Sequence, residues 1–94
     1  MMAERLSDDQ ITARLEGSQW RREGDEIVRD LEVRDFAAAM SLANRVADVA
    51  EQHNHHPDIL IHGWNKVRLS LTNHSAGGLT DTDFVVAGEF DGVI

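Results

Sequence analysis

The chain has 94 residues, of which 41% are hydrophobic and 28% are charged. This composition is typical of a globular protein rather than a disordered or fibrous one, and the length predicts one domain over residues 1–94. Nine basic residues stand against seventeen acidic ones, which gives a formal net charge of −8. Because nucleic-acid affinity depends on clustered Lys and Arg, we expect no nucleic-acid partner.

The chain contains no cysteine, which excludes disulfides, thiolate metal sites and a cysteine nucleophile. No apolar run approaches the roughly 18–20 residues that span a bilayer, and the first residues do not lead into a signal-peptide core. We therefore expect a cytoplasmic protein without a membrane partner. A chain this short buries only roughly 60–65% of its unfolded surface, so association of copies would add stability.

A capping box starts the first predicted helix, because the Ser7 hydroxyl can accept a hydrogen bond from the amide three residues on. Gly17 provides a stop for this helix. Residues 19–23 and 26–33 then predict two strands of a hairpin. Apolar residues share one parity in the second strand, and Arg29 is the exception to this alternation.

The long helix is the clearest element of the sequence. Asp35 is a suitable N-cap, and apolar residues recur at helical spacing through about Gln52. These residues are Phe36, Met40, Ala43, Ala47 and Ala50, with Val46 and Val49 beside them. Pro57 then excludes a continuation of the helix and biases His56 toward extended geometry.

Two more strands and a last helix complete the expected fold. Residues 58–62 and 66–73 predict strands joined around residues 63–65, and the second of them alternates apolar with polar residues. Thr80 begins a second capping box, in which Asp83 is the third helical residue. The order α-β-β-α-β-β-α predicts an α+β fold, with a four-stranded antiparallel sheet and helices packed on one face.

Four of the five histidines fall at two points where predicted elements end. His53, His55 and His56 follow the long helix, and His74 follows the last strand. Imidazole both accepts and donates protons near neutral pH, and loops on a rigid scaffold commonly carry function. The clustering therefore favours an acid–base site over scattered surface residues, whereas His62 reads as a solvated turn residue.

A metal site is the first alternative, since histidines with Glu51 or Asp83 could bind zinc. The spacing is poor for it, because adjacent His55 and His56 in an extended backbone point to opposite sides. We therefore expect no metal. Glu51 could hydrogen-bond the imidazole of His55, four residues on, and hold its tautomer if the helix extends that far, but a solvated carboxylate at the helix end is slightly favoured.

The two tryptophans could each stack on a flat heterocycle. Core or interface packing is favoured for Trp20, and both interpretations stay open for Trp64. Gly77-Gly78 predicts a bend that brings the loop of His74 against the start of the last helix. This glycine pair lacks the surroundings of a P-loop or a GxGxxG motif, so it predicts no phosphate site.

Three ordered segments and one aspartate resemble the pterin-4a-carbinolamine dehydratase family. They are residues 51–57 (Glu-Gln-His-Asn-His-His-Pro), residues 64–67 (Trp-Asn-Lys-Val), residues 74–80 (His-Ser-Ala-Gly-Gly-Leu-Thr) and Asp83. Each segment alone is weak evidence for the family, but the ordered set of segments is highly specific for it. The resemblance covers essentially the whole chain, because the inferred order of elements is also the family's.

The resemblance implies dehydration of 4a-hydroxytetrahydropterin to quinonoid dihydropterin, in support of aromatic amino-acid hydroxylases and tetrahydrobiopterin recycling. It implies no metal or organic cofactor. It assigns proton transfer to His55 and His74, with Asp83 supporting the histidine of the last loop. The residues expected to bind the pterin are His56, Pro57, Glu51, Asn73, Ser75 and Trp64.

The chain departs from the family pattern at two positions. Asn73 stands where the family usually has Thr, and Trp64 stands where some members have Tyr. The segment 58–64 is also a residue longer than in some relatives. The resemblance further implies a homodimer or homotetramer, and its alternative function is a non-catalytic dimerisation or assembly cofactor of the same fold.

Overall fold

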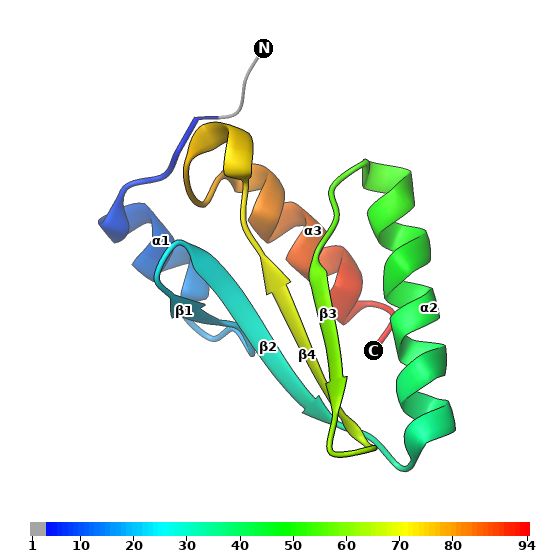
Figure 1. The fold of residues 1–94 in the computed structure, drawn as a ribbon. Coiled ribbons are helices and arrows are strands. Elements are labelled where there is room, and N and C mark those ends of the chain that lie inside the picture. Colours follow the sequence, from blue (N-terminus) through cyan, green and yellow to red (C-terminus); the bar gives the residue numbers. More distant parts are fainter. Residues whose placement is uncertain (1–3) are drawn as a thin grey trace.

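The computed structural model describes residues 4–94, whose elements follow the expected order α-β-β-α-β-β-α (Figure 1). The helices are α1 (Asp8–Leu15), α2 (Phe36–His53) and α3 (Asp81–Asp91). The strands are β1 (Arg21–Glu23), β2 (Glu26–Glu32), β3 (Asp58–His62) and β4 (Lys66–Leu71). A short 3₁₀ helix, η1 (His74–Ala76), precedes α3. The predicted α+β fold is confirmed.

The four strands form one antiparallel sheet in the order β1-β2-β4-β3. The central pair runs from Ile27 opposite Leu71 to Glu32 opposite Lys66. Strand β3 pairs with β4 alone and therefore forms an edge of the sheet. Helices α2 and α3 pack against each other on one face of the sheet, as the sequence predicts (Figure 1).

The core lies between the sheet and the helices. The alternation in β4 is confirmed, because Val67, Leu69 and Leu71 are all buried. The apolar residues recognised in α2 divide between two faces of the helix. Val46, Val49 and Ala50 join the core together with Ala39 and Leu42, whereas Phe36 and Met40 remain 55% and 44% exposed.

Arg29 faces the helices, and an ion pair explains why a charged residue occupies this position. Its guanidinium pairs with the carboxylate of Asp91, the last residue of α3. The same carboxylate accepts a hydrogen bond from Nε1 of Trp20 at 2.9 Å. Trp20 is 4% exposed and its ring lies 6.4 Å from that of Phe90, so its core assignment is confirmed.

The expected caps set the starts of the helices. The Ser7 amide donates to Oε1 of Gln10 at 2.8 Å, and the Gln10 amide donates to the Ser7 hydroxyl at 3.2 Å. Oδ1 of Asp35 accepts a hydrogen bond from the amide of Ala38 at 2.8 Å.

Within residues 4–94, none of the helices is long and apolar enough to cross a membrane.

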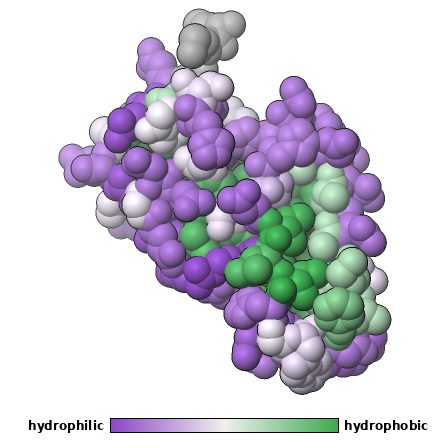
Figure 2. All heavy atoms as spheres, viewed as in Figure 1, coloured by the Kyte–Doolittle hydropathy of each residue, from purple (hydrophilic) through white to green (hydrophobic). Residues whose placement is uncertain are grey.

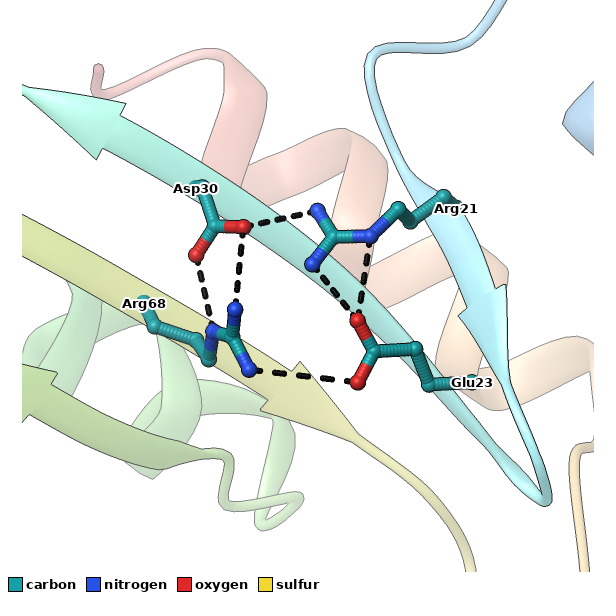
Figure 3. Close-up of polar contacts among 4 residues, drawn as sticks. All are labelled: Arg21, Glu23, Asp30 and Arg68. Atoms are coloured by element: carbon teal, nitrogen blue, oxygen red, sulfur yellow. Dashed lines mark hydrogen bonds and ion pairs between the residues drawn. The ribbon is translucent and has the colours of Figure 1, made fainter.

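The face of the sheet without helices carries a ring of alternating charges (Figure 3). The Arg21 guanidinium lies 2.6 Å from Glu23 and 2.7 Å from Asp30. The Arg68 guanidinium lies 2.8 Å from Asp30 and 3.8 Å from Glu23. Hydrogen bonds from Arg68, and then from Arg21, lower the pKa of the Asp30 carboxyl below its ordinary value. The ring joins β1, β2 and β4 without net charge.

We expect Asp30→Asn to lower the free energy of unfolding at neutral pH by at most about 1 kcal/mol, because solvent screens this half-exposed network. The folded-state pKa of Asp30 is lowered, so its stabilisation is present above the unfolded pKa of about 3.9. It is lost as the pH falls through the folded pKa. Urea unfolding of both proteins between about pH 7 and about pH 2 measures this loss.

The matched control is Asp48→Asn on the exposed side of α2, which lies outside the ring and should change stability little. A difference between Asp30→Asn and the native protein that stays constant at acid pH would contradict an ionic origin.

Candidate active site

Helix α2 ends where the histidine-rich segment begins. Asn54 adopts the left-handed conformation with φ of 47°, and its amide donates to two carbonyls of the last helical turn. The amide of His55 also bonds back to the carbonyl of Ala50 at 3.0 Å. This termination turns the chain, and Pro57 prevents it from returning to helix. His55 and His56 are thereby placed between a helix end and the start of β3.

A buried carboxylate holds the imidazole of His55. Nε2 of His55 lies 2.6 Å from Oδ1 of Asp83, and the His55 side chain is 14% exposed. Asp83 has no exposed surface, and its Oδ2 accepts hydrogen bonds from the amide and hydroxyl of Thr80 at 2.8 and 3.2 Å. Because the carboxylate accepts, His55 donates from Nε2. Its Nδ1 is then the acceptor of the neutral ring.

The partner of Asp83 corrects the expectation that it supports the histidine of the last loop. Asp83 contacts His55 rather than His74. The physical reason is that the capping box aims the Asp83 carboxylate back over the N-terminus of α3. Since α3 packs against α2, the residue that meets the carboxylate comes from the end of α2.

Glu51 is an exposed carboxylate at the end of α2, as the favoured interpretation predicts, and the imidazole that it meets is not that of His55. Its Oε2 lies 2.5 Å from Nε2 of His56, not of His55. Both side chains are largely exposed, at 75% for Glu51 and 55% for His56. The two adjacent imidazoles are therefore held by two different carboxylates, one buried and one at the surface.

Asn73 organises the loop that carries His74. Oδ1 of Asn73 accepts a hydrogen bond from the amide of Ala76 at 3.1 Å and thus caps η1. The carbonyl of Asn73 accepts a second bond from the amide of Gly78 at 3.2 Å. Gly77 supplies the left-handed residue, with φ of 76°, that closes the bend. The loop presents His74 and Ser75 as exposed side chains.

An open hollow of about 540 Å³ lies beside His74. Its wall is formed by the β1–β2 turn, the start of β3 at Asp58, the end of β4 and the η1 loop. Sites for small molecules commonly measure about 300–1,000 Å³. Because Asp58 pairs with Ser70 near the end of β4, the segment through His56 and the loop of His74 lie at the same end of the sheet (Figure 1).

The structure does not bring Trp64 to this end of the sheet. Trp64 lies in the turn between β3 and β4, beyond His62, whereas the histidine segment precedes the opposite end of β3. The indole is 62% exposed. Within one copy of the chain, the length of a strand separates Trp64 from His55 and His56.

Sequence reasoning did not single out the acidic wall of the hollow. Glu23, Asp25 and Glu26 of the β1–β2 turn line it, and the sheet brings Asp58, which is distant from them in the chain, to the same wall. Within residues 4–94, no three His, Asp or Glu side chains are grouped as ligands of a metal ion. The chemistry that the histidines offer is proton transfer. The imidazole of His55 is held by a carboxylate, and the imidazole of His74 is exposed.

The fold and site define a small α+β protein in which the segment of His55 and His56 and the loop of His74 lie at one end of an antiparallel sheet. The hollow at this end is lined by His74 and not by His55 or His56. The sequence pattern of the family described as Pterin 4 alpha carbinolamine dehydratase matches residues 4–93. The chain belongs to this family.

Curated relatives match over nearly the full length of the chain. A protein of Nocardia farcinica is 47% identical over 92 residues, which cover 97% of this chain and 96% of the relative. A protein of Roseiflexus sp. is 46% identical over 94 residues, which cover 99% of this chain and 100% of the relative. Both carry a provisional assignment as pterin-4-alpha-carbinolamine dehydratase.

Two solved structures share the fold. A transcriptional coactivator/pterin dehydratase from Brucella melitensis is 26% identical, with a TM-score of 0.87 over 96% of this chain and 98% of its own. A pterin dehydratase-like protein, described as a RuBisCO assembly factor in the alpha-carboxysome, is 19% identical. Its TM-score is 0.66 over 80% of this chain and 88% of its own, and the likeness shows the fold alone.

We expect the neutral imidazole of His55 to carry its proton on Nε2, because Asp83 accepts a hydrogen bond there. Heteronuclear NMR of the ring nitrogens measures the tautomer. Asp83→Asn should remove this preference, since an amide both donates and accepts. His53, which is exposed at the end of α2, is the internal control and should keep its spectrum. A proton on Nδ1 of His55 in the native protein would contradict the assignment.

Proposed function

We propose that the protein dehydrates 4a-hydroxytetrahydropterin to quinonoid dihydropterin by histidine acid–base catalysis. The observation that carries this proposal is the His55 imidazole, held by a buried carboxylate at the end of the sheet that also carries His74. Membership of the family and relatives at 46–47% identity support a dehydratase.

The reaction needs two proton transfers. The departing hydroxyl takes up a proton as the carbon–oxygen bond breaks, and the ring nitrogen loses one as the new double bond forms. In the proposal His55 and His74 perform these transfers, with His55 acting through Nδ1 because Asp83 holds Nε2. General acid–base catalysis typically contributes roughly 10²–10⁴-fold, or about 3–5 kcal/mol of the barrier.

The remaining residues of the motif are proposed to hold the pterin. His56, with Glu51 behind it, and Pro57 would contact the ring from the β3 side, and Ser75 from the loop. Asn73 is better described as a positioning residue, because its side chain caps η1 and so sets the place of His74. None of these roles involves a metal or an organic cofactor.

The proposal includes a setting and an oligomeric state. Tetrahydrobiopterin recycling in the cytoplasm is the expected context, and a homodimer or homotetramer the expected form. An apolar patch supports association: Phe36, Met40 and Leu60 are 55%, 44% and 52% exposed. An exposed apolar surface of this kind commonly marks an interface.

The alternative is a non-catalytic dimerisation or assembly cofactor. The same apolar patch would serve such a role, and one solved relative is described as an assembly factor. Catalysis is favoured, because a scaffold has no need of His55, His56 and His74 together.

An absorbance assay tests the proposed reaction. Substrate is generated by an aromatic amino-acid hydroxylase, and its decay is followed with and without the protein. We expect clear acceleration by the native protein and at least a tenfold loss in His74→Ala, from the general acid–base range. His74 is exposed, so its removal should leave the fold intact.

The matched control is His53→Ala, an exposed histidine outside the proposed pair, which should keep native activity. Equal decay with and without native protein would favour the non-catalytic cofactor instead.

A further inference from the structure

The start of α3 differs from the start of α1, although both helices begin with the same capping pattern. In α1 the third helical residue is Gln10, a neutral side chain at the surface. In α3 it is Asp83, a carboxylate without exposed surface, whose Oδ1 meets Nε2 of His55 at 2.6 Å. The cap of α3 therefore carries a buried charge that contacts a proposed catalytic side chain.

Thr80 supplies two hydrogen bonds to the carboxylate of Asp83. Its amide and its hydroxyl both donate to Oδ2, at 2.8 and 3.2 Å. Thr80 itself has no exposed surface, so bulk water does not compete for this hydroxyl. Because a buried charge without donors is costly, the hydroxyl of Thr80 bears directly on the state of the carboxylate.

The hydroxyl of Thr80 has a different role from its backbone. The backbone forms the start of α3, because the Thr80 carbonyl accepts a hydrogen bond from the amide of Asp83 at 3.1 Å. The terminal torsion of an aspartate side chain has broad minima, so a single donor on Oδ2 restricts it weakly. Two donors from different directions define the plane of the carboxylate. The hydroxyl thus fixes the direction in which Oδ1 faces His55.

The hydroxyl also stabilises the charge of the carboxylate. Hydrogen bonds to the ionised form of an acid favour that form, and burial opposes it. An ionised Asp83 only accepts, which obliges His55 to donate from Nε2 and leaves Nδ1 as its acceptor. A change at the Thr80 side chain therefore reaches Nδ1 of His55 through the carboxylate.

We propose that Thr80 is a positioning residue for the dehydration, and that its hydroxyl acts through Asp83 to hold the imidazole of His55 toward the pterin. Thr80 does not touch the substrate in this arrangement. Its role in the reaction rests on the proposed function, whereas the effect of its hydroxyl on the ring of His55 does not.

NMR of the His55 ring tests the contact without any assay of activity. Thr80→Val replaces the hydroxyl by a methyl group of similar size and keeps both backbone hydrogen bonds. We expect the Nε2 proton of His55 to exchange with water at least about tenfold faster in this variant, because hydrogen bonds to charged groups typically change an equilibrium by roughly 10–100-fold. Thr80→Ser keeps the hydroxyl and should stay within about twofold of the native rate.

The amide of Asp83 separates this effect from a loosening of the helix. It bonds to the carbonyl of Thr80 in each variant, so its own exchange rate should stay near the native value. If the Asp83 amide and the His55 ring proton exchange faster by the same factor, Thr80 is a structural cap alone and the proposal is overturned. An unchanged His55 ring proton in Thr80→Val would overturn it as well.

The absorbance assay measures the consequence for the reaction. We expect Thr80→Val to lower kcat roughly tenfold and to leave KM within about twofold, because Thr80 acts on a proton-transfer group and does not hold the substrate. Thr80→Ser should restore the native kcat. Equal losses in the Val and Ser variants, or a native kcat in Thr80→Val, would contradict a role for the hydroxyl.

The matched control is Ser7→Ala, which removes the capping hydroxyl of α1. This variant should unfold at a lower urea concentration, as the loss of a cap predicts, and keep the native kcat. If Ser7→Ala loses as much kcat as Thr80→Val, the loss reflects stability and the positioning role fails.

The two proposals can fail separately. If the native protein lacks dehydratase activity, the proposed function fails, and the exchange of the His55 ring proton still decides whether the hydroxyl positions the ring. If Thr80→Val does not fold, the native protein provides the test. The hydroxyl proton of Thr80 should give its own signal, whereas the exposed hydroxyl of Ser75 should merge with water. The Thr80 signal should also shift in His55→Gln, because both side chains share one carboxylate. A Thr80 proton that merges with water, or a signal that does not respond to residue 55, would overturn the proposal.

Discussion

Asp83 is buried in the first turn of α3, and both of its carboxylate oxygens accept hydrogen bonds, one from His55 and one from Thr80. A buried carboxylate without such partners costs several kcal/mol, so the start of α3 and the chain turn after α2 depend on each other. The rest of the site follows from this contact. It fixes which nitrogen of His55 is free, and it ties the histidine segment to the end of the sheet that carries His74.

The β3–β4 hairpin separates two groups of functional side chains. The histidines lie near one end of the hairpin and Trp64 lies in the turn at the other. One copy of the chain cannot bring them together, because the length of β3 lies between them, and a hydrophobic patch covers this strand and the adjoining part of α2 (Figure 2). Because the family fold also occurs in an assembly factor, function depends on these side chains and not on the fold.

Local signals predicted most of the fold. The capping boxes at Ser7 and Thr80 and the alternation in β4 are short-range patterns, and each is present in the structure. The core side of α2 was less predictable, because an alanine-rich helix offers two faces with similar spacing and only packing selects one. Arg29 interrupts the apolar pattern of β2 for a reason that no local pattern contains, since its partner Asp91 lies 62 residues away.

The sequence by itself determined the order of the elements, the family and the histidines of the candidate site, because capping, alternation and motif spacing are properties of neighbouring residues. Tertiary structure alone decided which carboxylate meets which imidazole: Asp83 meets His55, and Glu51 meets His56. It also decided that Trp64 stands apart from them. These choices depend on how α3 packs on α2 and on the length of one strand, which are distances in space that spacing along the chain does not encode.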